Sequence, residues 1–246
     1  MGHLKFLELR RALWRAPATA ALGAAFVLLG NAAWAATPAA TAPVPAAAPS
    51  AVAAPDLSSG DLTPASVGGF RSAEFGMTAA DVKAAIIKDF NVKAEAISSG
   101  ENTAERTQLL SVAVPDLLPG GGTAQVSYVF GYKSKTLIQV GVSWSAATDS
   151  TITEAELYAD GDVLRTHFMA AGYKPDSIKT GLVLQNGLLL FRGEDADGHA
   201  TILILQGQFK DAADGKQKTL TPTSLALLYS ASPQTPDVFK LAPGQF

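Results

Sequence analysis

The chain has 246 residues, with 19 basic and 22 acidic side chains, three histidines and no cysteine. The formal net charge of −3 gives no basic excess, so the composition argues against a nucleic-acid-binding protein. Without cysteine the chain has no disulfide framework, no thiolate metal site, no cysteine nucleophile and no lipidated cysteine.

The first 35 residues have the three-part order of a secretory signal peptide. Basic residues dominate residues 1–17, a short apolar run spans residues 18–29, and Ala33 and Ala35 occupy the two small positions of a cleavage site. Because the apolar run is shorter than the roughly 20 residues that cross a bilayer, we expect cleavage after Ala35 rather than a retained membrane anchor. The expected location is a bacterial periplasm, and the mature chain would carry 15 basic and 21 acidic side chains, a net charge of −6.

Residues 36–66 form an Ala/Pro-rich linker that contains six of the 14 prolines. Each proline removes a backbone donor and fixes φ, and the segment has no apolar periodicity, so a packed fold is not expected here. The segment is either an extended spacer or a leader without a role of its own.

A first α+β module is expected over residues 67–150. Thr78 is a good N-cap, Asp81 lies three residues further on, and an apolar stripe at helical spacing continues to Phe90, which predicts a helix of about 12 residues. Strand-like segments follow at residues 92–97, 107–114, 123–132 and 136–145, with the Gly120–Gly122 cluster as a turn.

The same order of elements returns in residues 151–246, which we expect to form a second module with a C-terminal tail. Residues 151–154 indicate a capping box and a helix through Phe168. Four strands are predicted at residues 182–185, 188–193, 200–209 and 224–232, with Asn186-Gly187 as the turn of a hairpin. The repeated order predicts an internal duplication.

The predicted fold class is therefore α+β, with two tandem modules, each one helix packed on a four-stranded antiparallel sheet. The first module alternates apolar and polar residues, so one face of its sheet is polar. The strands of the second module are apolar on both faces and need cover on both sides. Its helix supplies one cover, and the other has to come from the first module, the C-terminal tail or a partner.

The phrase Phe75-Gly76-Met77-Thr78, followed by Val82, resembles the opening of the helix-plus-four-strand repeats of beta-lactamase inhibitory proteins. It is also similar to the start of the single module in small outer-membrane-assembly lipoproteins of the BamE/SmpA type. The resemblance implies a tandem-repeat fold and a role in protein–protein contacts. The chain departs from these families because residues 151–153 lack the Gly-Met-Thr phrase, and because the disulfides and the lipidated cysteine are absent.

The sequence contains no readable catalytic constellation, no Gly-x-Ser-x-Gly elbow and no Ser-x-x-Lys motif, so we expect neither an enzyme nor a cofactor. One cluster has ligating side chains close together in sequence: Glu194, Asp195, Asp197 and His199. It is interpreted either as ordinary turn chemistry or as a weak calcium or zinc site.

Four aromatic residues are candidates for a binding surface, because Tyr and Trp are enriched at interfaces, with packing under the helices as the alternative. Tyr132 and Trp144, near strand ends, are expected to be the most exposed of the set Tyr128, Tyr132, Trp144 and Tyr229. Together these patterns predict an exported, non-enzymatic protein that contacts a protein partner in the cell envelope, as an assembly accessory or an enzyme inhibitor. The alternative is a periplasmic module that binds a small ligand or a metal.

Overall fold

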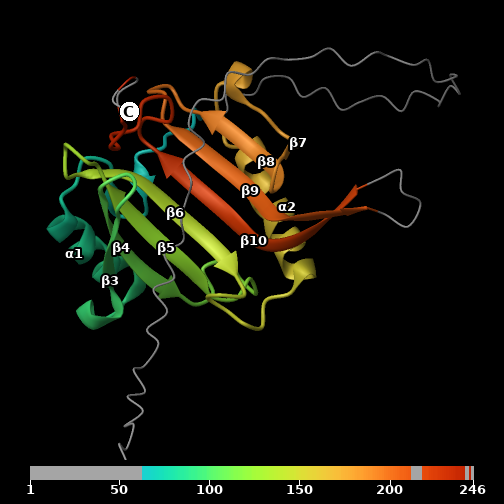
Figure 1. Ribbon diagram of the computed structural model, residues 1–246, viewed down its shortest axis with the longest axis horizontal. Helices are drawn as coiled ribbons and strands as arrows, with labels where there is room; N and C mark the ends of the chain where they lie inside the picture. Colours follow the sequence, from blue (N-terminus) through green and yellow to red (C-terminus); the bar gives the residue numbers. More distant parts are fainter. Residues whose placement is uncertain (1–62, 212–217, 242–243, 245–246) are drawn as a thin grey trace, which may run out of the picture.

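The structure, a computed structural model, describes residues 63–211, 218–241 and 244 (Figure 1). The predicted signal peptide and most of the linker lie outside these residues. In the described part, two helices lie behind one large antiparallel sheet, and a short hairpin precedes the first helix. Neither described helix is long and apolar enough to span a membrane.

Each half of the chain has one helix, one short 3-10 helix and four strands, in that order. After the hairpin of β1 (Gly69–Phe70) and β2 (Ala73–Glu74), the first half contains α1 (Ala79–Phe90), β3 (Ser98–Asn102), β4 (Thr107–Val114), β5 (Ala124–Phe130) and β6 (Leu137–Ser145). The second half contains α2 (Glu154–Met169), β7 (Leu182–Leu184), β8 (Gly187–Glu194), β9 (Ala200–Asp211) and β10 (Lys218–Ser230). The predicted order of elements is confirmed in both halves.

The two halves share one eight-stranded sheet, in the order β3-β4-β5-β6-β10-β9-β8-β7. Their last strands, β6 and β10, pair antiparallel from Ser145–Ser224 to Gln139–Ser230. The expectation of two separate four-stranded sheets is therefore corrected. Joining the last strands removes one exposed edge from each module, since an unpaired edge leaves backbone groups without partners.

Both helices pack on the same face of this sheet and share one apolar core. Val82 and Ile86 of α1 and Leu157, Leu164 and Phe168 of α2 belong to a single buried cluster. On the strands, the core residues alternate with residues of the opposite face, as in β5 with Val126, Tyr128 and Phe130 and in β6 with Val140, Val142 and Trp144. The predicted alternation of the first module is confirmed.

The helix starts show how local chemistry sets the boundaries. Thr78 caps α1 by accepting a hydrogen bond from the Asp81 backbone N–H, as predicted. For α2 the predicted cap is wrong by two residues, because Thr153 and Glu156 form the capping box. The reciprocal bonds of this pair satisfy two backbone donors, which the spacing of Thr151 and Glu154 does not.

Two other local predictions are corrected. Residues 92–97 do not form a strand, because a 3-10 turn at Ala94–Ala96 precedes β3. In the β7–β8 hairpin the two-residue loop is Gln185–Asn186 rather than Asn186-Gly187, because Gly187 pairs with Leu184. Turn residues predict that a hairpin exists better than they predict its register.

A strap, defined here as residues 63–74, joins the start of the fold to both halves. The Ala65 N–H donates to the Gly172 carbonyl after α2, and the Val67 N–H donates to Asp195 Oδ2 at 2.7 Å. Further along, Ser72 donates to the Asp89 carboxylate at the end of α1. Residues 63–66, which belong to the range assigned to the linker, therefore contact the second module.

Candidate functional site

The acidic cluster lies in the turn between β8 and β9. One potential ligand atom from each of Asp195, Asp197 and His199 lies within 4.8 Å of the others. Glu194 belongs to the predicted set but points elsewhere, because its carboxylate accepts a hydrogen bond from Arg192 at 2.5 Å. The structure thus brings three of the four predicted metal ligands together and separates the fourth.

The hydrogen bonds of Asp195 favour the interpretation of this cluster as a turn. Its Oδ1 accepts from the backbone N–H groups of Asp197 and His199, at 3.0 and 2.9 Å, and its Oδ2 accepts from Val67. The side chain is 2% exposed. Since three backbone donors occupy both of its oxygens, Asp195 has little capacity left for a cation. Through these hydrogen bonds Asp195 joins the β8–β9 turn to the strap.

His199, another member of the cluster, packs against an aromatic side chain. Its ring lies edge-on to Phe75, with centroids 5.4 Å apart, and its Nδ1 is 3.5 Å from Asp195 Oδ2. His167 lies on α2 beside Phe168, at a centroid distance of 5.1 Å. The hydrogen bonds of the described residues join neither imidazole to a Ser or Thr hydroxyl, which is the contact an activated nucleophile needs.

Two of the four candidate aromatics are buried. Tyr128 is 0% exposed and Trp144 is 1% exposed, and both belong to the core under the helices. The prediction that Trp144 is partly exposed is wrong, because its strand end lies within the sheet between β5 and β10. Burial raises the pKa of the Tyr128 hydroxyl well above its usual range. Neither ring can contact a partner in this arrangement.

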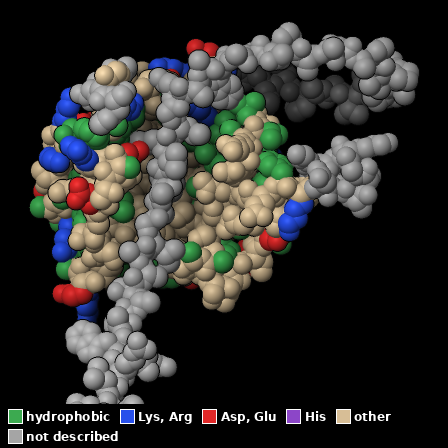
Figure 2. Space-filling model, viewed as in Figure 1, with side chains coloured by type: hydrophobic (Ala, Val, Ile, Leu, Met, Phe, Trp, Pro, Cys, Tyr) green, Lys and Arg blue, Asp and Glu red, His purple; other side chains and the backbone are tan. Residues whose placement is uncertain are grey.

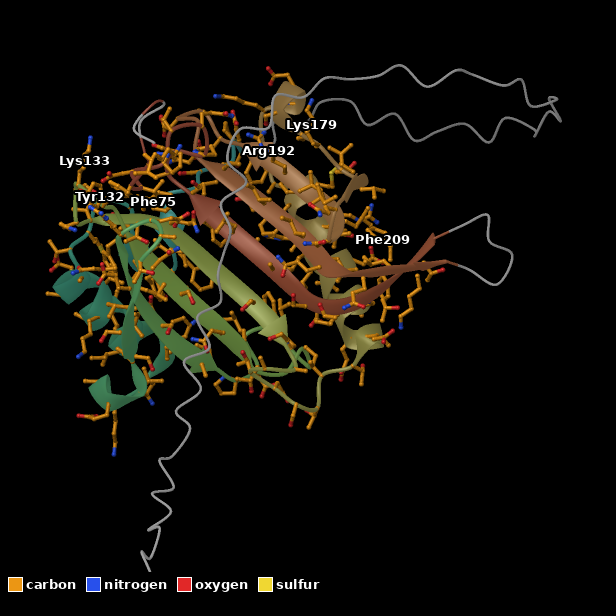
Figure 3. The ribbon with its side chains drawn as sticks, viewed as in Figure 1. Phe75, Tyr132, Lys133, Lys179, Arg192 and Phe209 are labelled. Carbon is orange, nitrogen blue, oxygen red and sulfur yellow. The ribbon has the colours of Figure 1, made fainter. Side chains whose placement is uncertain are left out.

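The other two aromatics pack against different segments. Tyr132 lies at the loop after β5 and meets Phe239 of the C-terminal tail edge-on at 5.5 Å. Tyr229 of β10 stacks on Phe70 of the strap at 5.7 Å and borders a cavity of about 330 Å³ between the strap and α2. The four aromatics therefore do not form one surface (Figure 3 shows Tyr132 at the far end of the sheet from β8).

We call the side of the sheet that faces away from the helices the open face. Its first-module half and its second-module half carry different side chains. On the side of the first module it has mainly hydroxyl and amide side chains at paired positions, together with the apolar pair Leu109 and Val129: Ser111, Gln125, Ser127, Gln139 and Ser143 are the polar members. On the side of the second module the strand registers place aliphatic side chains, which we call the aliphatic patch: Leu182, Leu184, Leu189, Ile202, Ile204 and Leu228.

The orientation of the patch follows from its neighbours in the strands. Leu203, Leu205 and Leu227 belong to the core cluster, so Ile202, Ile204 and Leu228, which alternate with them, face the other way. Leu189 pairs with Ile204 and lies outside the core cluster although it is only 7% exposed. Each of these residues was part of an apolar run in the sequence, but only the register assigns it to a face.

The open face carries almost no charge. From β4 to β8, outside the hairpin arm at residues 207–222, its one described charged pair is Arg192 with Glu194, and these two side chains neutralise each other. In Figure 2, which views this side, lysine, arginine, aspartate and glutamate colours gather at the margins of the molecule. Figure 3 shows Arg192 beside Lys179, at the end of β8.

The described C-terminal tail runs from the end of β8 to the first module. Gln234 Nε2 donates to Glu194 Oε1 at 3.4 Å. Further along, Asp237 accepts hydrogen bonds from the backbone of Lys133 and Ser134, and the Phe239 N–H donates to the Glu105 carbonyl, at the loops of the first module. These bonds lower the pKa of the Asp237 carboxyl. The first module lies beside the second in the sheet rather than over it. Among the described residues, neither the first module nor the tail therefore lies over the centre of the patch.

None of the protein-family models, curated proteins or solved structures with which the chain was compared matches it. The apolar runs of the second module were the sequence signal for its open face. The aromatic residues were misleading, because all four pack against described parts of the chain's own fold.

Proposed function

We propose that the protein is exported to the cell envelope and acts without catalysis, by binding another protein through the aliphatic patch. The observation that carries the proposal is the patch itself, an uncharged aliphatic surface on the side of the sheet that neither helix covers. Five of its six side chains are half-buried and Leu189 is buried, so the patch is a partly accessible apolar surface. Contiguous apolar surface on soluble proteins marks interaction sites more often than chance.

Physical chemistry supports a protein rather than a polar ligand at this site. Burial of aliphatic surface contributes about 25 cal/mol per Å², and the patch offers no charged side chain to orient a small polar molecule. The polar half beside it presents hydroxyl and amide groups that can hydrogen-bond at the rim of an interface. This arrangement, an apolar centre with a mainly uncharged polar border and one ion pair, Arg192 with Glu194, at its edge, suits a protein partner.

Export and the class of role come from the sequence. The signal-like residues 1–35 support a periplasmic location, and the repeated helix-plus-four-strand order is in line with the resemblance to inhibitory and assembly proteins. The protein would then serve as an assembly accessory or as an inhibitor of an envelope enzyme. No cofactor is part of this proposal.

Capture of a partner from envelope extract tests the proposal. The exported protein, purified with a C-terminal tag, is compared with Ile204→Lys, which places a charge in the patch, and with Val163→Lys. Val163 is a matched control because it is an aliphatic residue on α2 that is 61% exposed. We expect a stoichiometric partner with the wild type and Val163→Lys, reduced at least tenfold with Ile204→Lys. Equal capture by all three proteins would contradict the proposal.

A further inference from the structure

Strand β7 forms one margin of the sheet and pairs only with β8 among the described strands. Its outward backbone N–H and C=O groups are therefore available to a further strand. The side chain of Val183, in the middle of β7, is 73% exposed. This margin belongs to the same module as the aliphatic patch, and Leu182 and Leu184 of β7 are part of the patch.

The β7–β8 hairpin is apolar on both of its faces. Leu182, Leu184 and Leu189 lie on the open face, while Val183, Leu188 and Leu190 face the side of the helices. No charged residue occurs in residues 180–191. Natural sheets normally protect a margin with charged residues, proline or a bulge that twists the edge away. The β7 margin is protected mainly by its short length, because β7 has only three residues.

A cleft of about 270 Å³ lies next to this margin on the side of the helices. Its floor consists of Leu188, Leu190 and Leu205, and one wall is the segment Thr180–Gly181 that leads into β7. The opposite wall is the flank of α2, where Tyr158 precedes the exposed ion pair of Asp162 and Arg165, at 3.3 Å. A strand beside β7 would therefore have apolar surface on both sides of the sheet.

The opposite margin of the sheet provides an internal comparison. Strand β3 is also an edge, but its five residues are Ser98, Ser99, Gly100, Glu101 and Asn102, and four of them are exposed. The cavity beside it is lined by polar residues, Ser99, Glu101 and Gln108, and by apolar ones that include Leu109, Leu110 and Phe130. A charged, polar edge discourages strand addition. The two margins occupy equivalent places in the two modules and differ in chemistry.

We propose that β7 accepts an extended, uncharged segment of the partner protein as a ninth strand. Alternate side chains of that segment would enlarge the aliphatic patch on one face and cover Val183 and the mouth of the cleft on the other. The segment must be uncharged at its centre, because a charge placed over Val183 or Leu182 would lose its hydration without a counter-charge. This inference rests on the proposed function and specifies how the partner is recognised.

A synthetic peptide tests this mode of binding. The probe is acetyl-Lys-Thr-Val-Leu-Val-Thr-Lys-amide, titrated into the purified exported protein by calorimetry. Two isomers carry two N-methyl groups each, either on the two valines or on the leucine and the second threonine. Because N–H groups of one parity point to one side of a strand, one isomer keeps the donors that face β7. We expect this isomer to bind within about threefold of the parent and the other to bind about tenfold or more weakly.

Two protein variants locate the site. Val183→Lys should weaken the probe at least tenfold, and its exposed position leaves the fold intact, as circular dichroism would verify. The matched variant Ser99→Lys on β3 should leave binding unchanged. Absence of binding to the wild type, equal binding of both N-methyl isomers, or loss of binding in Ser99→Lys but not in Val183→Lys would each overturn the inference.

The outcome also separates the two proposals. If Ile204→Lys abolishes partner capture from envelope extract and Val183→Lys does not change it, the patch acts without strand addition, and only the inference about β7 falls. If neither variant changes partner capture, both proposals fall. If both variants abolish capture and only one N-methyl isomer binds, the partner docks along β7 and across the patch.

Discussion

The two modules have the same order of elements and share one sheet, yet the sides they turn away from the helices differ. The first presents mainly Ser and Gln on its open face, with one apolar pair at Leu109 and Val129, and a polar margin at β3. The second presents the aliphatic patch and an uncharged margin at β7. Since both contribute to one core, the difference is not required for folding. One module supplies scaffold, and the other carries the surface that we assign to binding.

The strongest test of the shared core is a pair of substitutions, Phe130→Ala in the first module and Phe191→Ala in the second. Both rings are 0% exposed, so each substitution should lower the free energy of unfolding by about 3–5 kcal/mol. Because the cluster is continuous, we expect one cooperative transition in urea for each variant. Two separate transitions in either variant would show that the modules are independent units.

The next largest effect should come from Asp195→Ala. Removal of this buried carboxylate leaves the N–H groups of Val67, Asp197 and His199 without their acceptor, at an expected cost of about 2–3 kcal/mol. Asp197→Ala, at an exposed position of the same turn, should cost less than about 0.5 kcal/mol.

Calcium or zinc addition completes that test. If the cluster is a turn, neither ion shifts the melting temperature of the wild type, and calorimetry detects no heat of binding. A rise in melting temperature that disappears in Asp197→Ala would instead support the metal site predicted as the alternative, and would give the second module a different function.

The contact between the two modules should make the melting temperature depend on pH. Asp160 of α2 lies against Gly121 of the first module, and burial, with a smaller contribution from the charge of Glu156, raises the pKa of its carboxyl. A raised pKa in the folded state favours folding at low pH, and this contribution is lost as the pH rises through that folded-state value. Asp160→Asn should therefore raise the melting temperature at pH 7.

The gain from Asp160→Asn should shrink towards pH 3, where the carboxyl of the wild type is protonated. Asp162→Asn is the control on the same helix, since Asp162 is exposed and forms an ion pair with Arg165. It should not produce the same pattern. An Asp160→Asn gain that does not depend on pH would mean that the amide stabilises the contact for another reason.

The smallest effect is expected for Tyr128→Phe. The hydroxyl of Tyr128 is buried and has no hydrogen-bond partner among the described residues, so its removal should be neutral or stabilise the fold by up to about 1 kcal/mol. Urea denaturation would measure it. Destabilisation by more than 1 kcal/mol would show that the hydroxyl is hydrogen-bonded in solution.

Sequence patterns predicted the helices and most strands because caps and alternation are local. They placed α1 within one residue, and they gave the extent of β4 as Thr107–Val114. They did not predict that β6 pairs with β10, because strand pairing between modules depends on contacts more than 75 residues apart. The 3-10 turns had no clear local signal, and one of them lies where a strand was predicted at residues 92–97.

The candidate site was harder to predict, for a physical reason. Aromatic side chains such as Trp144 stabilise cores as well as interfaces, so their presence did not locate a surface. The apolar runs of the second module did indicate a face in need of cover. Only the register showed that Ile202 and Ile204, adjacent in sequence to core residues, point away from the helices.

The central claim is that a partner protein covers the aliphatic patch. Its most direct test is a photo-crosslinking residue at position 204, expressed in cells, with the same residue at position 163 as the control on α2. We predict a discrete crosslinked species with a second protein from position 204 and none from position 163. A patch that stays uncrosslinked in the cell envelope, or equal crosslinking from both positions, would contradict the account.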